Sequence, residues 1–207
     1  FGVIEMDDFN SIHSFREKSN SDGRVINGGF MVLQPEIFDY IIDDNTIFEQ
    51  YPLEKMAELN ELKGFCKNLS DESGRIIRQY FRTGVNIENK TDQSPVTIAD
   101  KNAEEKMREM IMKEFPSHGI VGEEFGSYNE NAEYTWILDP IDGTKSFICG
   151  AVTFGTLIAL MKNGEPVLGV INQPVLNEFL IGDNYVSELN GNQVKVRKCS
   201  NLSDAVL

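Results

Sequence analysis

The stretch that decides the fold reads Leu138-Asp-Pro-Ile-Asp-Gly-Thr-Lys145, and it follows an apolar run that begins at Tyr134. Pro140 biases the residue before it toward an extended backbone, so the apolar run is predicted to be a strand that continues to Asp139. Gly143-Thr144 then offers a turn and the start of a helix. The stretch therefore predicts a strand that passes through a tight turn into a helix.

This turn concentrates oxygen ligands. The carboxylates of Asp139 and Asp142 and the carbonyl of Ile141 suit one hard cation. Glu123 and Asp100 lie upstream, in short segments that are expected to converge on the turn. Because magnesium prefers oxygen ligands and helix N-terminal amides bind phosphate, the pattern indicates a metal site for phosphoryl transfer. A lone D-x-x-D is also common in a solvated turn, and surface charge is the alternative interpretation.

Composition excludes several classes of protein. The chain has 207 residues, of which 41% are hydrophobic, as is ordinary for a globular protein with one sizeable domain or two small ones. The formal net charge of -14 argues against nucleic acid or an anionic membrane as a partner. A small anionic substrate would therefore depend on local cations, which a bound metal supplies. The two histidines, His13 and His118, disfavour a histidine-based hydrolase or a zinc site.

The cysteines indicate a reducing compartment. Cys66, Cys149 and Cys199 are widely spaced and form no C-x-x-C pair, so neither a disulfide framework nor a zinc ribbon is predicted. A cytoplasmic location is expected. No apolar run approaches the roughly 18 residues of a membrane span, and no signal peptide is visible. Because the chain begins at Phe1 rather than methionine, its natural N-terminus is expected to lie upstream.

Residues 1–60 are predicted to contain pieces of a nucleotide-binding α/β sheet. Asn27-Gly28-Gly29 lies within the longest candidate strand, where the glycine pair would either let a sugar phosphate approach the backbone or form a bulge. Composition favours the bulge. Pro35 sits at a natural first helical position. The predicted strands are 2–5, 11–16 and 25–33, and the predicted helices are 36–42 and 52–62.

Four blocks of this segment are similar to the later part of glucose-1-phosphate cytidylyltransferase, a sugar nucleotidyltransferase. They read Gly2-Val-Ile-Glu5, Ser14-Phe-Arg-Glu-Lys18, Ile26-Asn-Gly-Gly-Phe30 and Phe48-Glu-Gln-Tyr-Pro-Leu-Glu-Lys55. The resemblance implies common ancestry and a partial α/β nucleotidyltransferase fold for residues 1–60. The family's glycine-rich nucleotide loop and downstream acidic metal motif have no counterpart here, so the segment lacks the parts that nucleotidyl transfer needs.

A long amphipathic helix is predicted over residues 61–82, because the apolar positions follow helical spacing and the small Ser73 and Gly74 allow close packing. Its charged side chains are interpreted as a solvated face. Residues 85–92 then form a polar hairpin candidate. Lys90 in this hairpin either steers a phosphate or a further metal or, as is more common for a lysine in such a loop, contacts solvent.

Thr97-Ile-Ala-Asp100 has the pattern of a capping box, and it precedes a helix that is predicted to run to about Phe115. Asp100 then lies in the first turn, where the helix dipole favours a carboxylate. Without the rest of the chain, Asp100 would be interpreted as a cap and nothing more. Residues 119–122 are predicted to form a short strand that delivers Glu123.

Beyond Thr144 the sequence alternates apolar strands with tight turns. Asn163-Gly164 and Asn190-Gly191 are signals for type I′ turns between antiparallel strands. Two helices followed by an antiparallel meander predict an α+β layered sandwich with the helices packed on one face of the sheet. The predicted strands are 154–162, 167–173, 179–182, 185–189 and 194–196.

From about Leu62 to Leu207 the chain resembles the inositol monophosphatase superfamily. The motifs that carry the resemblance are Pro95-Val-Thr-Ile-Ala-Asp100, Gly122-Glu-Glu124 and Trp136-Ile-Leu-Asp-Pro-Ile-Asp-Gly-Thr144. The blocks most similar to the histidinol-phosphate phosphatase type are Tyr80-Phe-Arg82, Lys90-Thr-Asp-Gln-Ser-Pro-Val-Thr97, Asp142-Gly-Thr-Lys-Ser-Phe147 and Phe154-Gly-Thr-Leu-Ile-Ala-Leu160. The resemblance implies that residues 61–207 form a helix and antiparallel-sheet sandwich of inositol monophosphatase type. It also implies a phosphatase for a small phosphorylated alcohol, most like histidinol phosphate.

The superfamily's metal chemistry maps onto residues of these motifs. The resemblance implies that Glu123, Asp139 and the Ile141 carbonyl hold a first magnesium ion, and that Asp139 and Asp142 help to hold a second. Two cations neutralise phosphate charge and lower the pKa of bound water, so no histidine or cysteine nucleophile is required. For complete members of the family the resemblance also allows a homodimer.

The resemblance further implies catalytic roles beside the metal ligands. Thr144 and Asp100 would orient a metal-bound water and help it to lose a proton, while the Gly143-Thr144 amides would cradle the phosphate. The attack of the metal-activated water is then direct and in line, without a covalent phosphoenzyme. Glu124 either supports a metal ligand or is simply exposed.

The sequence departs from the superfamily pattern near its end. The family's second metal also takes an aspartate from a C-terminal Trp-Asp motif, whereas this chain has only Trp136, and Asp204 does not match. The C-terminal part of the domain is therefore expected to lie beyond Leu207, and the chain alone is expected to bind magnesium weakly and turn over little substrate. The alternatives are a catalytically inactive chimera or remnant and a fragment of a sugar-1-phosphate nucleotidyltransferase.

Overall fold

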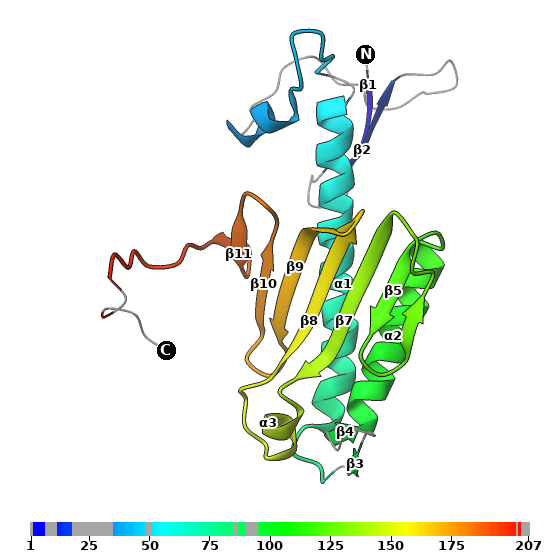
Figure 1. Cartoon of the computed structure of the whole chain (residues 1–207), viewed down its shortest axis with the longest axis vertical. Helices are drawn as coiled ribbons and strands as arrows, with labels where there is room; N and C mark the ends of the chain where they lie inside the picture. Colours follow the sequence, from blue (N-terminus) through cyan, green and yellow to red (C-terminus); the bar gives the residue numbers. More distant parts are fainter. Residues whose placement is uncertain are drawn as a thin grey trace. The chain divides into compact units, whose positions relative to one another are not determined.

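The computed structural model describes residues 2–6, 12–17, 35–48, 51–84, 87–89, 95–201 and 203. The chain forms two compact units, Phe1–Lys67 and Asn68–Leu207, and helix α1 (Tyr51–Tyr80) belongs partly to each (Figure 1). The predicted domain boundary at residue 60 therefore falls within a helix. Among the described residues, no helix is long and apolar enough to cross a membrane.

The first unit begins with a hairpin, in which β1 (Gly2–Met6) pairs antiparallel with β2 (Ile12–Glu17) near the predicted strands. The short helix predicted over 36–42 is a 3-10 helix, η1 (Pro35–Tyr40). The helix ends early because the backbone N–H groups of Ile42 and Asp43 donate to Thr46 Oγ1 at 3.1 and 3.0 Å. The predicted strand 25–33, with its glycine pair, lies outside the described residues.

Helix α1 is continuous where the sequence predicts two helices, 52–62 and 61–82, so that prediction is wrong. No proline lies near the junction, and Gly64 just beyond it does not break the helix. Pro52 occupies the first turn, where its missing N–H costs no hydrogen bond. The buried positions keep one helical spacing through the predicted break. They include Leu53, Ala57, Leu62, Cys66, Leu69, Ser73 and Ile77.

The second unit is built on an eight-stranded sheet with the strand order β12-β11-β10-β9-β8-β7-β5-β6. The strands are β5 (Gly119–Gly122), β6 (Gly126–Tyr128), β7 (Tyr134–Asp142), β8 (Gly155–Lys162), β9 (Glu165–Gln173), β10 (Glu178–Gly182), β11 (Ser187–Leu189) and β12 (Asn192–Gln193). The predicted Asn-Gly turns are present, with positive φ at Asn163, Gly164, Asn190 and Gly191. The strand predicted over 194–196 is wrong, and Val196 there is 96% exposed with no packing to hold it extended.

The sheet is mixed rather than wholly antiparallel, because β5 pairs parallel with β7 while the other pairs are antiparallel. β6 pairs antiparallel with the outer edge of β5. The chain then crosses to the other edge of β5, where β7 runs in the same direction as β5. Gly119 consequently lies opposite Thr135, and Gly122 opposite Leu138. Because Gly122 lies opposite Leu138, the acids that come next on each strand, Glu123 and Asp139, lie at the same end of the sheet.

Two helices cover one face of this sheet, as the α+β prediction requires (Figure 1). Helix α2 (Ile98–Glu114) packs against β7. The second half of α1 is tied to β9 by Asn172 Nδ2, which donates to the Ser70 carbonyl at 3.1 Å. A Cβ at Gly74 would lie 3.0 Å from Pro174 Cβ, so the predicted close approach at this glycine is confirmed.

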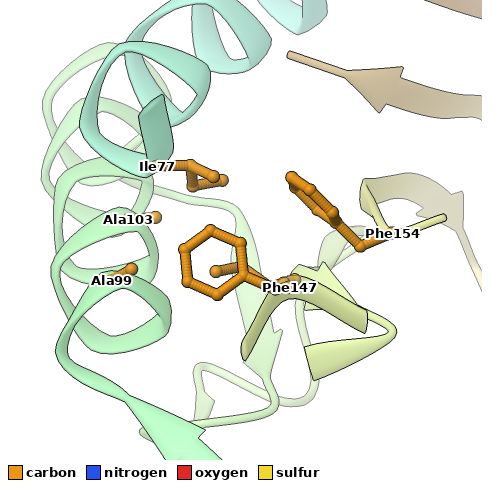
Figure 2. Close-up of a cluster of buried hydrophobic side chains, with 6 residues drawn as sticks. Ile77, Ala99, Ala103, Phe147 and Phe154 are labelled. Atoms are coloured by element: carbon orange, nitrogen blue, oxygen red, sulfur yellow. The ribbon is translucent and has the colours of Figure 1, made fainter. Parts of the chain in front are cut away.

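A hydrophobic cluster anchors the turn that follows β7 (Figure 2). Phe147 of the short helix α3 (Thr144–Ile148) points between α1 and α2 and packs edge-on against Phe154 with ring centroids 5.2 Å apart. Ile141 belongs to the same buried cluster. Because Ile141 and Phe147 are both fixed in the core, the backbone between them is held at both ends.

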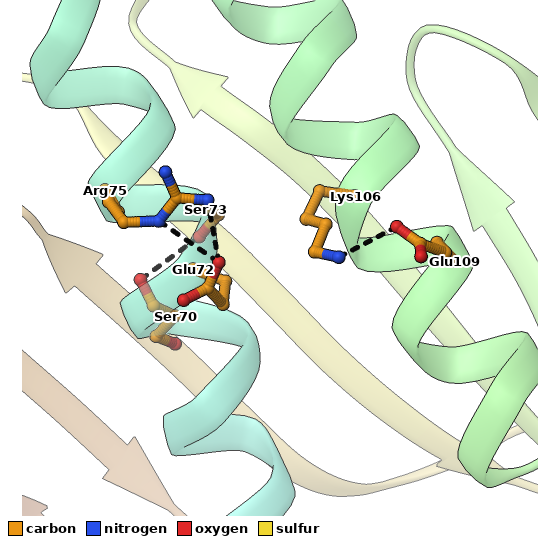
Figure 3. A network of polar contacts seen from close by, with 6 residues as sticks. All are labelled: Ser70, Glu72, Ser73, Arg75, Lys106 and Glu109. Carbon is orange, nitrogen blue, oxygen red and sulfur yellow. Dashed lines mark hydrogen bonds and ion pairs between the residues drawn. The ribbon is translucent and has the colours of Figure 1, made fainter.

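The outer faces of the helices carry polar contacts, as expected for a solvated surface (Figure 3). On α1, Arg75 donates to Glu72 Oε2 at 2.9 and 3.2 Å, and on α2, Lys106 donates to Glu109 at 2.8 Å. Ion pairs this exposed stabilise a fold by about 0–1 kcal/mol each. They therefore do not determine the architecture.

The face of the sheet away from the helices carries apolar side chains. Ile137 and Ile171 are 42% and 52% exposed, whereas their neighbours Leu138 and Val170 are buried against the helices. This alternation is the period of two that a strand imposes. A hollow of about 600 Å³ lies over this face, and Asp139 lines it with the apolar residues.

Candidate active site

The site is built around the end of β7. Asp139 pairs with Leu157 across the sheet, and the register shifts between Asp139 and Asp142, so that Pro140 and Ile141 form an irregular bulge. The Pro140 carbonyl accepts a hydrogen bond from the buried Thr156 hydroxyl at 2.8 Å. The bulge is therefore fixed by the neighbouring strand as well as by the core contact of Ile141, and it re-aims the side chains around it.

Asp139 is the most perturbed acid of the site. Burial raises its pKa to about 7, and a hydrogen bond with Glu123 and the negative charges of Glu123, Asp142 and Asp100 act in the same direction. Three further carboxylates therefore lie within electrostatic reach of Asp139. The predicted convergence of acids from separate segments is therefore present.

Asp100 closes the capping box that the sequence predicts. Its Oδ2 accepts hydrogen bonds from the Thr97 backbone N–H at 2.9 Å and from Thr97 Oγ1 at 2.6 Å, while Ala99 N–H donates to Thr97 Oγ1. Burial raises the pKa of Asp100, the hydrogen bonds from Thr97 lower it, and the charge of Glu123 adds to the rise. Asp100 is thus both a helix cap and a charge that faces the other acids.

Gly143 and Thr144 form the turn into α3. Gly143 has φ of +88°, in the left-handed region, and a Cβ there would lie 3.0 Å from the Thr153 carbonyl oxygen. Thr144 Oγ1 donates a hydrogen bond to the Ile141 carbonyl at 3.0 Å. The threonine hydroxyl and the carbonyl predicted to bind metal are therefore direct partners.

Glu123 follows β5 and is positioned by backbone contacts. Its N–H donates to the Leu138 carbonyl at 3.2 Å, which ties it to β7 immediately before Asp139. The N–H of Glu124 donates instead to the carboxylate of Glu104 on α2 at 2.7 Å. Lys90, the remaining candidate, lies outside the described residues.

Sequence reasoning missed Glu104 and its partner Arg108. Glu104 is fully buried and accepts a hydrogen bond from Arg108 Nε at 2.8 Å. The sequence contains an indication of this burial, because Glu104 lies within the apolar stripe formed by Ala103, Met107 and Ile111. A carboxylate at such a position must be paired if it is charged, and pairing implies a specific partner.

His118 has a structural role in the described structure. Its Nδ1 accepts a hydrogen bond from Trp136 Nε1 at 3.1 Å, and its ring stacks on Phe115 and Tyr134. These contacts hold the side chain in the loop between α2 and β5.

The residues present suit a hard cation. Asp139 Oδ1 is buried and has no hydrogen-bond partner among the described residues. A buried carboxylate oxygen without a donor is costly, and a cation would satisfy it. In the described part of the chain, however, no three acidic, histidine or cysteine side chains form a preformed metal cluster. Carboxylates that face one another repel, so without a cation they are not expected to come together into a metal cluster. The interactions of the other acids with Asp139 and the unpaired oxygen of Asp139 are therefore the stronger evidence for a cation site.

A model of the inositol monophosphatase family matches residues 58–207 of this sequence. The chain belongs to the inositol monophosphatase family. The match includes the acids of the site and the sheet that carries them. Because it begins at residue 58, the resemblance of residues 1–60 to a nucleotidyltransferase stays a prediction.

Relatives of this chain include phosphatases named for more than one substrate. The chloroplastic bifunctional phosphatase IMPL2 of Arabidopsis thaliana is 51% identical over 154 residues, 73% of this chain and 44% of that protein. A histidinol-phosphatase of Chlorobaculum parvum is 42% identical over 130 residues, 62% of this chain and 50% of that protein. The chain thus spans about half the length of the curated relatives it matches.

Solved structures agree with the fold. An inositol monophosphatase from Zymomonas mobilis is 42% identical with a TM-score of 0.59, covering 69% of this chain and 55% of that one. One from Thermotoga maritima is 32% identical with a TM-score of 0.62, covering 67% of this chain and 54% of that one. The α+β fold of inositol monophosphatase type is therefore confirmed.

Proposed function

We propose that the protein is a magnesium-dependent phosphomonoesterase that hydrolyses a small phosphorylated alcohol. The observation that carries the proposal is the buried, unpartnered Oδ1 of Asp139 within reach of three further carboxylates. An all-oxygen donor set favours magnesium over the softer metals that histidine and cysteine bind.

Four residues would hold the metal: Glu123, Asp139, Asp142 and the carbonyl of Ile141. Bound magnesium would neutralise phosphate charge and lower the pKa of a coordinated water. Asp139 must lose its proton to serve as a ligand, and a cation favours that loss. The bulge that fixes Ile141 would hold the carbonyl in place during binding.

Asp100 and Thr144 would orient the attacking water and help it to lose its proton, with direct in-line displacement of the alcohol. The N–H groups of Gly143 and Thr144 would bind the phosphate at the turn into α3. A covalent route through cysteine is disfavoured at Cys66, because burial raises the pKa of its thiol to about 12. Hydrolysis without a protein nucleophile is therefore the chemistry that these residues support.

Histidinol phosphate is the substrate that we propose first. Its support is the 42% identity to the Chlorobaculum parvum histidinol-phosphatase and the 38% identity, over 109 residues, to that of Mycobacterium tuberculosis. A place in histidine biosynthesis would follow from this substrate. A cytoplasmic location is proposed because none of the described cysteines forms a disulfide. A homodimer of the complete protein also belongs to this proposal.

Calorimetry with the chain and its Asp139→Asn variant tests the proposal. We expect the chain to bind Mg²⁺, the variant to bind it at least about tenfold more weakly, and histidinol phosphate to bind only with Mg²⁺ present. Phosphate release that is lost on adding a chelator would support the proposal further. A chain that binds no Mg²⁺ under any condition would refute it. Tighter binding of inositol monophosphate than of histidinol phosphate would refute only the choice of substrate.

A further inference from the structure

We propose that Glu104 is a positioning residue, whose buried carboxylate holds the turn between β5 and β6 and thereby aims Glu123 at Asp139. This inference rests on the proposed metal-binding function. Glu104 would not itself touch the metal or the substrate. Its role would be to fix the backbone of the segment that carries a metal ligand.

Glu104 is bound on both of its oxygens by this turn. Its Oε2 accepts a hydrogen bond from the Glu124 N–H at 2.7 Å, and its Oε1 accepts one from the Phe125 N–H at 3.2 Å. The side chain is fully buried, so water does not compete for these bonds. The two amides immediately after Glu123 are therefore fixed by one carboxylate from a separate helix.

Arg108 completes this clamp, one helical turn further along α2. Its Nε donates to Glu104 Oε1 at 2.8 Å, its Nη2 donates to the Gly126 carbonyl, and its guanidinium lies 5.9 Å from the centre of the Phe125 ring. Only 11% of the Arg108 side chain is exposed. The buried charge of Glu104 is thus paired, and both members of the pair hold the same turn.

Gly122 provides the space that the clamp occupies. A Cβ at this position would lie 1.9 Å from Glu104 Oε1 and 2.7 Å from Arg108 Nη2. Such distances are not tolerated, so any side chain at Gly122 would displace the carboxylate. The glycine before Glu123 is therefore explained by close approach of α2, rather than by an unusual backbone angle.

The clamp and the sheet both hold the backbone around Glu123. The Glu123 N–H is fixed to the Leu138 carbonyl of β7, and the next two N–H groups are fixed to Glu104. Glu123 is exposed, so burial does not hold it in place. Its direction depends on these backbone contacts and on the hydrogen bond between its carboxylate and Asp139. Residues that orient a metal ligand in this way typically contribute about 10–100-fold to metal affinity.

Four variants test the clamp in the full chain. Glu104→Gln keeps the size but removes the charge and one acceptor, Glu104→Asp keeps the charge but is one methylene too short to reach the turn, and Gly122→Ala displaces the carboxylate. The control is Glu105→Gln, which removes an exposed charge from the same helix. Mg²⁺ affinity is measured by calorimetry well below each melting temperature, and amide hydrogen exchange is followed at Glu124 and Phe125.

We expect the first three variants to bind Mg²⁺ about 10–100-fold more weakly and to exchange both amides faster, while the control is unchanged. Glu104→Asp is decisive, because an effect of charge alone predicts that it binds Mg²⁺ normally. Normal affinity in Glu104→Asp, or lower melting temperatures with unchanged affinity in all three variants, would overturn the inference. If the unmodified chain failed to bind Mg²⁺, both the proposed function and this inference would be wrong. Normal Mg²⁺ binding in every variant would refute only the positioning role of Glu104.

Discussion

Burial and three neighbouring carboxylates all raise the pKa of the Asp139 side chain. Its pKa of about 7 means that, without a cation, the side chain is largely protonated below neutral pH. A carboxylic acid binds magnesium poorly, because the proton and the metal compete for the same oxygen. The proposed metal site should therefore be sensitive to pH in a range where an ordinary aspartate is not.

We predict that the apparent Mg²⁺ affinity rises with pH up to about 7 and then levels off. Since the pKa of Asp139 is raised, binding below that pH must displace a proton, which reduces affinity by roughly tenfold per pH unit for one proton. Calorimetry in buffers of different ionisation enthalpy would measure both the affinity and the proton released. Asp139→Asn should bind more weakly and lose this pH dependence. An affinity independent of pH between about 5 and 7 would contradict the assignment.

Gly143 is a second residue of the site, and there is little space for a Cβ atom at this position. We predict that Gly143→Ala lowers the free energy of unfolding by about 1–2 kcal/mol or more, because an L-residue is strained at positive φ. The added Cβ would also press on the Thr153 carbonyl, 3.0 Å away. The variant should bind phosphate compounds more weakly, because the turn and its N–H groups would shift.

Gly164 supplies the matched control for that substitution. It has φ of +85°, but nothing lies within 4 Å of an added Cβ. Gly164→Ala should therefore show the backbone penalty alone in urea denaturation, with no change in ligand binding. Equal effects of the two substitutions on stability and binding would show that the space around Gly143 is unimportant.

At the scale of elements, α2 links the core to the site. Its first turn carries Asp100, its middle carries Glu104, and its apolar stripe is buried against the sheet. The N-terminus of the helix is closed by the Thr97 capping box, so the position of Asp100 depends on that cap. A change in the cap should consequently affect both stability and the site.

We predict that Thr97→Ala lowers the free energy of unfolding by about 1 kcal/mol, as loss of an N-cap hydroxyl usually does. Thr97→Ser keeps the oxygen that bonds to Asp100 and Ala99, and it should retain most of the stability. Chemical denaturation of both variants provides the measurement. If Thr97→Ser were as unstable as Thr97→Ala, the methyl group of the buried threonine, and not the cap, would be the stabilising feature.

At the scale of the whole molecule, the sheet is covered by helices on one face and carries exposed apolar residues on the other. Ile137 and Ile171 lie on the uncovered face with Leu157, beside the hollow that Asp139 lines. Exposed apolar patches commonly mark surfaces that associate with other protein. The candidate metal site therefore borders an exposed apolar surface of the kind that associates with other protein.

We predict that the 207-residue chain self-associates in a concentration-dependent way through this face. The double substitution Ile137→Thr and Ile171→Thr keeps β-branched side chains but reduces apolar surface, and it should shift the chain toward monomer. Analytical ultracentrifugation over a range of concentrations would measure the shift. Val196→Thr, at a position 96% exposed outside the sheet, is the control. A monomeric unmodified chain would contradict the prediction.

The sequence by itself determined the features that depend on near neighbours. The capping box at Thr97, the two Asn-Gly turns and the strand that ends at the Asp139 bulge were predictable, because each is governed by residues within about four positions. The convergence of Asp100, Glu123, Asp139 and Asp142 was predictable as well, from the placement of acids at the ends of short elements.

Only the tertiary structure decided what depends on contacts between distant segments. The parallel pairing of β5 with β7 follows from which edge β7 joins, which no local pattern encodes. The continuity of α1 is consistent with favourable packing across both predicted helices, and the raised pKa of Asp139 depends on burial and on charges brought in from other elements. Glu104 acquires its role because α2 passes close to Gly122. Local sequence therefore placed the chemical groups at the candidate site, and long-range packing determined how they are held and how strongly they bind protons.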